Sequence, residues 1–115
     1  MLPVEYVLVL LQVGGQDSLD VAASYNNIGA VYKSLSKYEE ALEMHSKSLD
    51  IKTRILGGDN HPDVADSKEN IGLVFQKMTK KSEARQMFTE AAGIRRKVFG
   101  ADHPLTKKSE YLAAQ

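Results

Sequence analysis

The stretch SYNNIGAVY at residues 24–32 decides the fold, because a similar stretch, SKENIGLVF, recurs 43 residues later at residues 67–75. Ser, Asn, Ile, Gly and Val recur in register, and an aromatic residue ends both copies. Between Val21 and Gly57, 13 of 37 positions are identical to the residue 43 positions later. A self-match at a long fixed period is typical of an array of stacked structural units.

The spacing of apolar residues predicts that each copy is a helix. Apolar side chains recur at steps of three and four, which places them on one helical face. These candidate core positions are Val21, Tyr25, Ile28, Val31, Tyr32 and Leu35 in the first copy, and Val64, Ile71, Val74, Phe75 and Met78 in the second. A second amphipathic segment follows each copy. We expect about six helical segments joined by short turns, and no strand.

Capping and turn residues mark the starts and ends of these helical segments. Ser18 is a good helix N-cap, and the sequence Ser36-Lys37-Tyr38-Glu39 has the S-x-x-E pattern of a capping box, which would end one helix and start the next. Gly57-Gly58 would end that helix, and His61-Pro62 would start another. Gly100 and His103-Pro104 repeat these last signals one unit later.

The repeat divides the chain, which we interpret as one domain over residues 1–115. Residues 5–13 correspond to the end of a preceding unit's second helix. Residues 18–60 form the first unit and 61–102 the second. Residues 103–115 are a truncated third unit or a capping helix. Val7, Leu8, Leu11 and Leu112 would then lie at exposed apolar ends, where self-association could cover them.

Composition argues against several classes of protein. Fifteen basic residues balance 15 acidic ones, which does not favour nucleic-acid binding. We interpret the cations Lys80, Lys81, Arg85, Arg95, Arg96 and Lys97 as a solvated helix face. The chain has no cysteine, so no disulfide or thiolate metal site is available, which fits a reducing compartment such as the cytoplasm. The apolar run at residues 7–11 is too short to span a membrane.

The repeated residues resemble the tetratricopeptide repeat. The G-x-D-H-P turn at residues 100–104, the Asn-Asn-Ile-Gly sequence and the 43-residue period resemble its kinesin light chain and nephrocystin-3-like type. The matching positions are Tyr25, Ile28, Gly29, Tyr32, Ala41, His45 and Ser48, then Lys68, Ile71, Gly72, Phe75, Ala84, Phe88 and Ala91. In this pattern Gly29 and Gly72 let the two helices of a unit approach closely, with Ala41 and Ala84 opposite. We therefore predict that Gly29→Leu unfolds the domain.

The resemblance implies an all-α solenoid, in which antiparallel helix pairs stack into a right-handed superhelix. Its first helices would line a concave groove for a peptide or a partner helix. By family position, the groove residues would be Ala23, Asn26, Ala30, Lys33 and Ser34 in the first unit, and Asp66, Glu69, Leu73, Gln76 and Lys77 in the second.

The resemblance also suggests roles for single residues. Asn26 resembles a clamp for ligand backbone, because an amide offers a donor and an acceptor together. Glu69 departs from this pattern, since a carboxylate only accepts, and this puts an acidic ligand in doubt. Asn27 and Asn70 are expected to lie between neighbouring helices.

No catalytic motif is visible, and no cofactor or metal is expected. Asp59, His61, Asp102 and His103 fit turn and capping roles better than metal ligation, and His45 fits a packed position. The leading hypothesis is a protein-interaction scaffold without enzymatic activity, acting in the cytoplasm as a segment of a larger protein. The alternative is a structural module that self-associates through its apolar ends.

Overall fold

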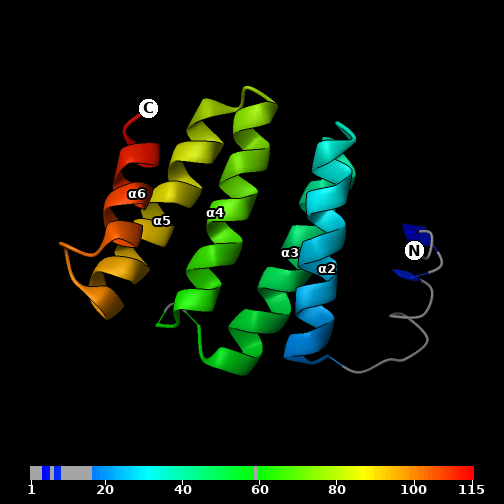
Figure 1. The fold of residues 1–115 in the computed structure, drawn as a ribbon, viewed down its shortest axis with the longest axis horizontal. Coiled ribbons are helices and arrows are strands. Elements are labelled where there is room, and N and C mark those ends of the chain that lie inside the picture. Colours follow the sequence, from blue (N-terminus) through cyan, green and yellow to red (C-terminus); the bar gives the residue numbers. More distant parts are fainter. Residues whose placement is uncertain (1–3, 6, 9–16, 59) are drawn as a thin grey trace.

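A computed structural model describes residues 4, 5, 7, 8, 17–58 and 60–115 (Figure 1). Its labelled helices are α2 (Leu19–Ser34), α3 (Tyr38–Leu56), α4 (Pro62–Lys77), α5 (Lys81–Phe99) and α6 (Pro104–Ala113). Residues 4, 5, 7 and 8 are also helical, whereas the rest of the predicted segment 5–13 lies outside the described residues. No strand occurs among the residues described, and the all-α prediction is confirmed.

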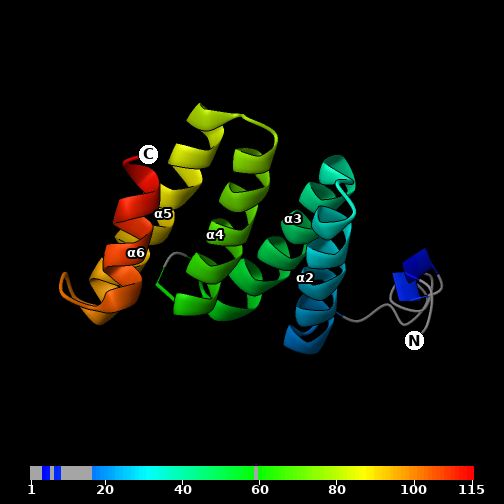
Figure 2. The same ribbon diagram turned by 45° about the horizontal axis from the view of Figure 1, so that its top comes forward.

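The helices form antiparallel pairs that stand side by side in the order of the sequence. Helices α2 and α3 make one pair, and α4 and α5 make the next (Figure 1). Helix α6 packs against α5, and the turned view shows the same order (Figure 2). Each element contacts mainly its neighbours in sequence, which is the arrangement of an α-solenoid.

The predicted helix starts are confirmed at three places. The Ser18 side chain accepts a hydrogen bond of 3.1 Å from the backbone N–H of Val21. His61 and His103 each precede a proline at the start of a helix. Their Nδ1 atoms each accept a backbone N–H from two residues ahead at 3.1 Å. Both histidines are therefore helix caps.

The capping box predicted at Ser36-Lys37-Tyr38-Glu39 is wrong. Ser36 has a positive φ of 60°, and Lys37, which precedes α3, makes no side-chain capping bond. The backbone N–H of Lys37 instead reaches back to the carbonyl of Tyr32 at 2.8 Å. A hydrogen bond from the residue after a left-handed turn back to a carbonyl of the preceding helix is typical of a helix C-terminus. Thr79 repeats the conformation with a φ of 59°. Ser36 and Thr79 thus end the first helices, as the sequence predicted for Ser36, but they do not cap the second helices.

The core runs between the helices of each pair, where two glycines allow close approach. A Cβ atom on Gly29 would lie 2.8 Å from Nε2 of His45, and one on Gly72 would lie 2.6 Å from Cε1 of Phe88. The predicted close approach is thus present. Ala41 and Ala84 are buried, but the groups that face the glycines are these two rings.

Two predicted core positions of the first unit are solvent-exposed. Val31 is 40% exposed because it lies on the flank of the face of α2 that carries Ile28 and Tyr32, and Leu35, which follows the last residue of α2, is 59% exposed. At the other end of the first core, Val7 and Leu8 are half-buried and pack against it. The expectation that these two residues form an exposed apolar end is therefore corrected.

Candidate groove and its polar junctions

The first-unit candidates meet at a pocket between the two helix pairs. Asn26, Ala30, Lys33 and Ser34 of α2 line a pocket of about 220 Å³ together with His45 and Asn70. Helix α3 supplies His45 and α4 supplies Asn70, so three helices build the pocket. The fifth candidate, Ala23, is exposed and is not among the lining residues. Four of the five predicted groove residues of this unit therefore share one site.

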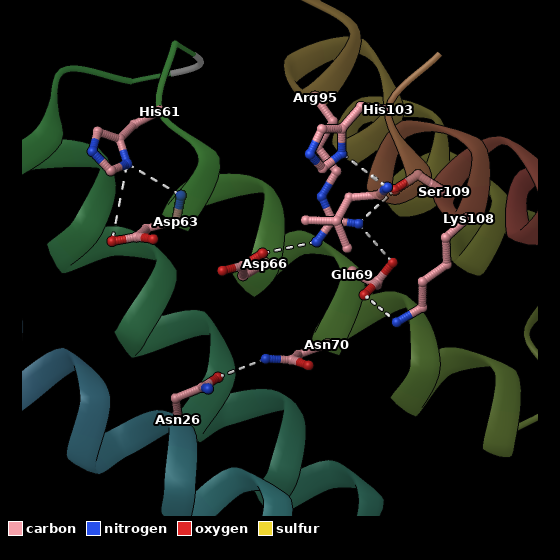
Figure 3. A network of polar contacts seen from close by, with 11 residues as sticks. Asn26, His61, Asp63, Asp66, Glu69, Asn70, Arg95, His103, Lys108 and Ser109 are labelled. Atoms are coloured by element: carbon pink, nitrogen blue, oxygen red, sulfur yellow. Dashed lines mark hydrogen bonds and ion pairs between the residues drawn. The ribbon is translucent and has the colours of Figure 1, made fainter. Parts of the chain in front are cut away.

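The amide of Asn26 joins the two units. Its Oδ1 atom accepts a hydrogen bond of 3.0 Å from Nδ2 of Asn70 and lies 2.7 Å from Nδ1 of His45 (the first contact is drawn in Figure 3). Because that oxygen accepts from Asn70, the His45 contact requires the ring proton on Nδ1. Both lone pairs of Oδ1 are then occupied, and the Nδ2 group of Asn26 is left as the donor. Asn70 thus lies between helices as expected, whereas Asn27 is exposed.

The environment of His45 favours its neutral form. The residue is only 2% exposed. Burial, followed by the positive charges of Lys33 and Lys52, lowers the pKa of His45 from its ordinary 6.5 to about 4. The neutral ring packs against Gly29 and donates to Asn26, so it holds the pocket wall in place near pH 7.

This pKa shift predicts a loss of stability in mild acid. Between pH 6.5 and about 4 the unfolded chain binds a proton at His45 and the folded chain does not, so stability falls as pH falls. The full shift corresponds to about 3 kcal/mol. We expect His45→Phe, which copies Phe88 of the second unit, to show a smaller loss across this interval. Urea unfolding from pH 7.5 to 4.5 measures the difference, and parallel stability curves for the two proteins would contradict it.

The second-unit candidates are placed differently, because two of them belong to an ion network (Figure 3). Arg95 of α5 donates to Glu69 and to Asp66 on α4, both at 2.8 Å, and to Oγ of Ser109 on α6 at 2.7 Å. Lys108 of α6 adds a contact of 3.3 Å to Glu69. The network joins three helices, so Glu69 and Asp66 connect the second unit to α6.

The remaining second-unit candidates lie further along α4. Leu73 is half-buried, and Gln76 and Lys77 are exposed. Gln76 lines a separate pocket of about 300 Å³ with side chains that include Phe88 and Leu112. Of the ten predicted residues, four therefore line the pocket at the first junction and two belong to the ion network at the second, whereas Leu73 is half-buried and Ala23, Gln76 and Lys77 are exposed.

Arg95 corrects the interpretation of the cations as a solvated face. Its side chain is 2% exposed, whereas those of its neighbours Arg96 and Lys97 are solvent-exposed. The sequence did contain a signal for this position. Arg95 follows Ala91 by four residues and Phe88 by seven, which is the spacing of the buried face of α5. Ser109 and Lys108 carried no comparable signal, because their partners are on other helices.

Among the described residues we find neither a cluster of metal ligands nor a membrane-spanning helix. No group of three or more His, Cys, Asp or Glu side chains is placed there to hold a metal ion. None of the helices in this part of the chain is long and apolar enough to cross a membrane.

The ring of His103, beyond its capping role, stacks on Phe99 with centroids 4.3 Å apart.

Comparison with known proteins places the repeat. The tetratricopeptide repeat family matches residues 20–97. The structure is similar to a putative kinesin light chain of Podosopora anserina with nearly identical TPR-like repeats, with a TM-score of 0.79 and 21% identity. That match covers 95% of this chain and 52% of the other. No match was found among curated proteins.

Two other solved structures share the architecture. BtubC (BKLC) of P. vanneervenii has a TM-score of 0.70 and 19% identity, over 83% of this chain and 37% of that one. The N-terminal domain of stress-induced protein-1 of C. elegans has a TM-score of 0.59 and 28% identity, over 79% and 66%. The chain thus spans between about a third and two thirds of the length of the structures it resembles.

Proposed function

The chain belongs to the tetratricopeptide repeat family, and we propose that it is a scaffold that binds an extended peptide or a partner helix along α2 and α4. Tetratricopeptide repeats generally serve protein–protein interaction rather than catalysis. We divide the scaffold into units at residues 18–60 and 61–102, with 103–115 as the start of a third unit or a cap. We place the scaffold in the cytoplasm, as a segment of a larger protein.

One observation carries this proposal: the pocket at the first junction has polar groups that the fold leaves unused. The Nδ2 group of Asn26 and the ammonium group of Lys33 have no partner among the described residues. The Ser34 hydroxyl donates to the carbonyl of Ala30 at 3.1 Å, so its oxygen still accepts. The small side chain of Ala30 leaves room for a ligand backbone to approach.

These groups match the backbone of an extended peptide. Asn26 and Lys33 would donate to ligand carbonyl oxygens, and Ser34 would accept a ligand N–H. Since backbone groups are common to all sequences, this pocket would contribute affinity, and residues elsewhere in the groove would contribute specificity. Leu73, Gln76 and Lys77 of α4 are the positions we propose for that second role, with Ala23 and Asp66 at the opposite end of the groove.

A binding experiment tests the pocket directly. Peptides selected from a random displayed library would be labelled, and their Kd values measured by fluorescence anisotropy. We expect Asn26→Ala with Lys33→Ala to weaken binding about tenfold or more, since about 1.4 kcal/mol corresponds to each factor of ten. The matched control is Asn27→Ala with Lys37→Ala, because both residues are exposed and outside the pocket. Equal Kd values for the two double variants would rule out the pocket.

An alternative function as a self-assembling structural module has one observation in its favour. Tyr111 on α6 is 66% exposed and Leu105 is 37% exposed. Apolar groups on the last helix of a stack can be covered by another chain. If another copy of the chain covers these groups, Tyr111→Lys would reduce the sedimentation coefficient at high protein concentration. A sedimentation coefficient of the unaltered chain that is independent of concentration would contradict this self-association.

A further inference from the structure

The two turns inside the helix pairs occupy equivalent positions in the repeat but carry opposite charge. Residues 34–43 contain one lysine against three glutamates, a net charge of −2. The equivalent residues 77–86 contain three lysines and one arginine against one glutamate, a net charge of +3. We name Glu39, Glu40 and Glu43 the acidic turn, and Lys77, Lys80, Lys81 and Arg85 the basic turn.

The helix dipole favours Glu39 and Glu40 in the first turn of α3 and Lys77 in the last turn of α4, but the described part of the fold gives the other cations no partner. All seven side chains are exposed. Among described residues none of the four cations forms an ion pair, and of the three glutamates only Glu43 does, with Lys47 at 3.8 Å. Lys81 begins α5, where the positive end of the helix dipole disfavours a cation. The stability of the domain therefore does not account for Lys80, Lys81 and Arg85.

The two turns also face the same way. Both connect the first helix of a pair to the second, and Figure 1 shows them at the same end of the helices, one unit apart. The view in Figure 2 agrees. Two complementary patches on one edge can pair with the same edge of an identical molecule. A two-fold axis midway between them brings each acidic turn onto the partner's basic turn, so both contacts form at once.

We propose that this edge is an interaction surface for a second copy of the chain, which docks antiparallel through the reciprocal contacts of the acidic and basic turns. None of the seven residues that define the turns lines the pocket of Asn26, and Lys77, which we also assign to the groove, is left unchanged in the variants below. This edge is also a different surface from the apolar end at Tyr111. Since exposed ion pairs are weak and screened by salt, the dimer is expected at low ionic strength and high concentration.

Charge reversal provides the test, with sedimentation velocity of the whole chain as the measurement. One variant carries Glu39→Lys, Glu40→Lys and Glu43→Lys; the other carries Lys80→Glu, Lys81→Glu and Arg85→Glu. In 20 mM salt we expect the unaltered chain to dimerise and each variant alone to remain monomeric, with its dimer Kd raised about tenfold or more. An equimolar mixture of the two variants restores both contacts, and we expect it to dimerise again.

Control variants separate this edge from the rest of the molecular surface. Lys107→Glu changes an exposed charge on α6, outside both turns, and is expected to leave the dimer unchanged. Circular dichroism checks that the variants fold, and the glutamine versions of the acidic turn weaken the dimer without adding repulsion. A monomer for the unaltered chain at 20 mM salt would overturn the proposal. So would a dimer that persists in either variant or in 1 M salt, or a mixture that stays monomeric.

Discussion

Gly72→Leu is expected to leave most of the chain unfolded at 25 °C, and Gly29→Leu is expected to do nearly the same. Even the Cβ atom at position 72 would lie 2.6 Å from the Phe88 ring, which is 1% exposed and cannot move away without displacing its neighbours. Three further carbon atoms would force α4 and α5 apart. The loss would be several kcal/mol, which is comparable to the whole stability of a small domain.

The chain contains a matched control for this substitution. Gly93 is also inside a helix, but nothing lies within 4 Å of a Cβ atom built on it. Gly93→Leu should therefore fold, and Gly93→Ala should gain about 1 kcal/mol from its better helix propensity. Urea unfolding followed by circular dichroism measures all three variants. A folded Gly72→Leu protein with an unchanged midpoint would show that the helix pair does not need this close approach.

A double-mutant cycle identifies the ring as the cause. Gly72→Ala alone adds one carbon against Phe88 and is expected to cost about 1–3 kcal/mol. In a Phe88→Leu background the ring atoms Cε1 and Cζ are absent and the shorter, flexible side chain can turn away, so the same substitution should cost less than about 1 kcal/mol. If the cost of Gly72→Ala were equal in both backgrounds, backbone conformation rather than packing would be responsible.

Much of the fold could be predicted because equivalent packing residues recur in both units of the repeat. Gly29 and Gly72 recur in register, and the resemblance to the tetratricopeptide repeat implied a close approach of two helices at both. The turn at Ser36 could not be predicted in the same way. Its S-x-x-E pattern is a genuine capping signal. In the structure, however, Ser36 adopts a left-handed conformation, and the last carbonyl groups of α2 accept hydrogen bonds from this turn. This conformation depends on how the two helices meet.

The candidate groove was predictable in part. The resemblance to the tetratricopeptide repeat implied by family position that Asn26, Ala30 and Lys33 lie together, and these residues do line one pocket. The contacts of Asn26 with His45 and Asn70 span 19 and 44 residues of sequence. Spacing along one helix carries no information about such partners, and for this reason the burial of Glu69 with Arg95 was missed as well.

Arg95→Met is expected to destabilise the domain by about 3–5 kcal/mol, the usual cost of breaking a buried ion pair by removing one partner. Glu69 is 6% exposed, and without Arg95 its carboxylate would keep only the contact with Lys108. Asp66 is half in solvent and can be rehydrated, so Glu69 carries most of the penalty. Methionine retains the length and apolar stem of the arginine, and cavity formation is thereby kept small.

The neighbouring arginine is a matched control. Arg96 pairs with Glu110 of α6 at 2.7 Å, as Arg95 pairs with Ser109, but its side chain is 58% exposed. An exposed pair contributes about 0–1 kcal/mol, so Arg96→Met should change stability little. Urea unfolding compares the two variants. Equal midpoints would mean that burial does not strengthen the network, contrary to the arrangement of its charges.

The location of the damage distinguishes this network from general packing. Because Arg95 connects α4 and α5 to α6, its loss should release α6 before the rest of the domain, and amide hydrogen exchange in residues 104–113 should accelerate first. Adding Glu69→Leu to Arg95→Met removes the uncompensated charge and should recover a large part of the stability. A double variant less stable than Arg95→Met would show instead that Glu69 stabilises the fold through Lys108, and that the arginine is the replaceable member of the network.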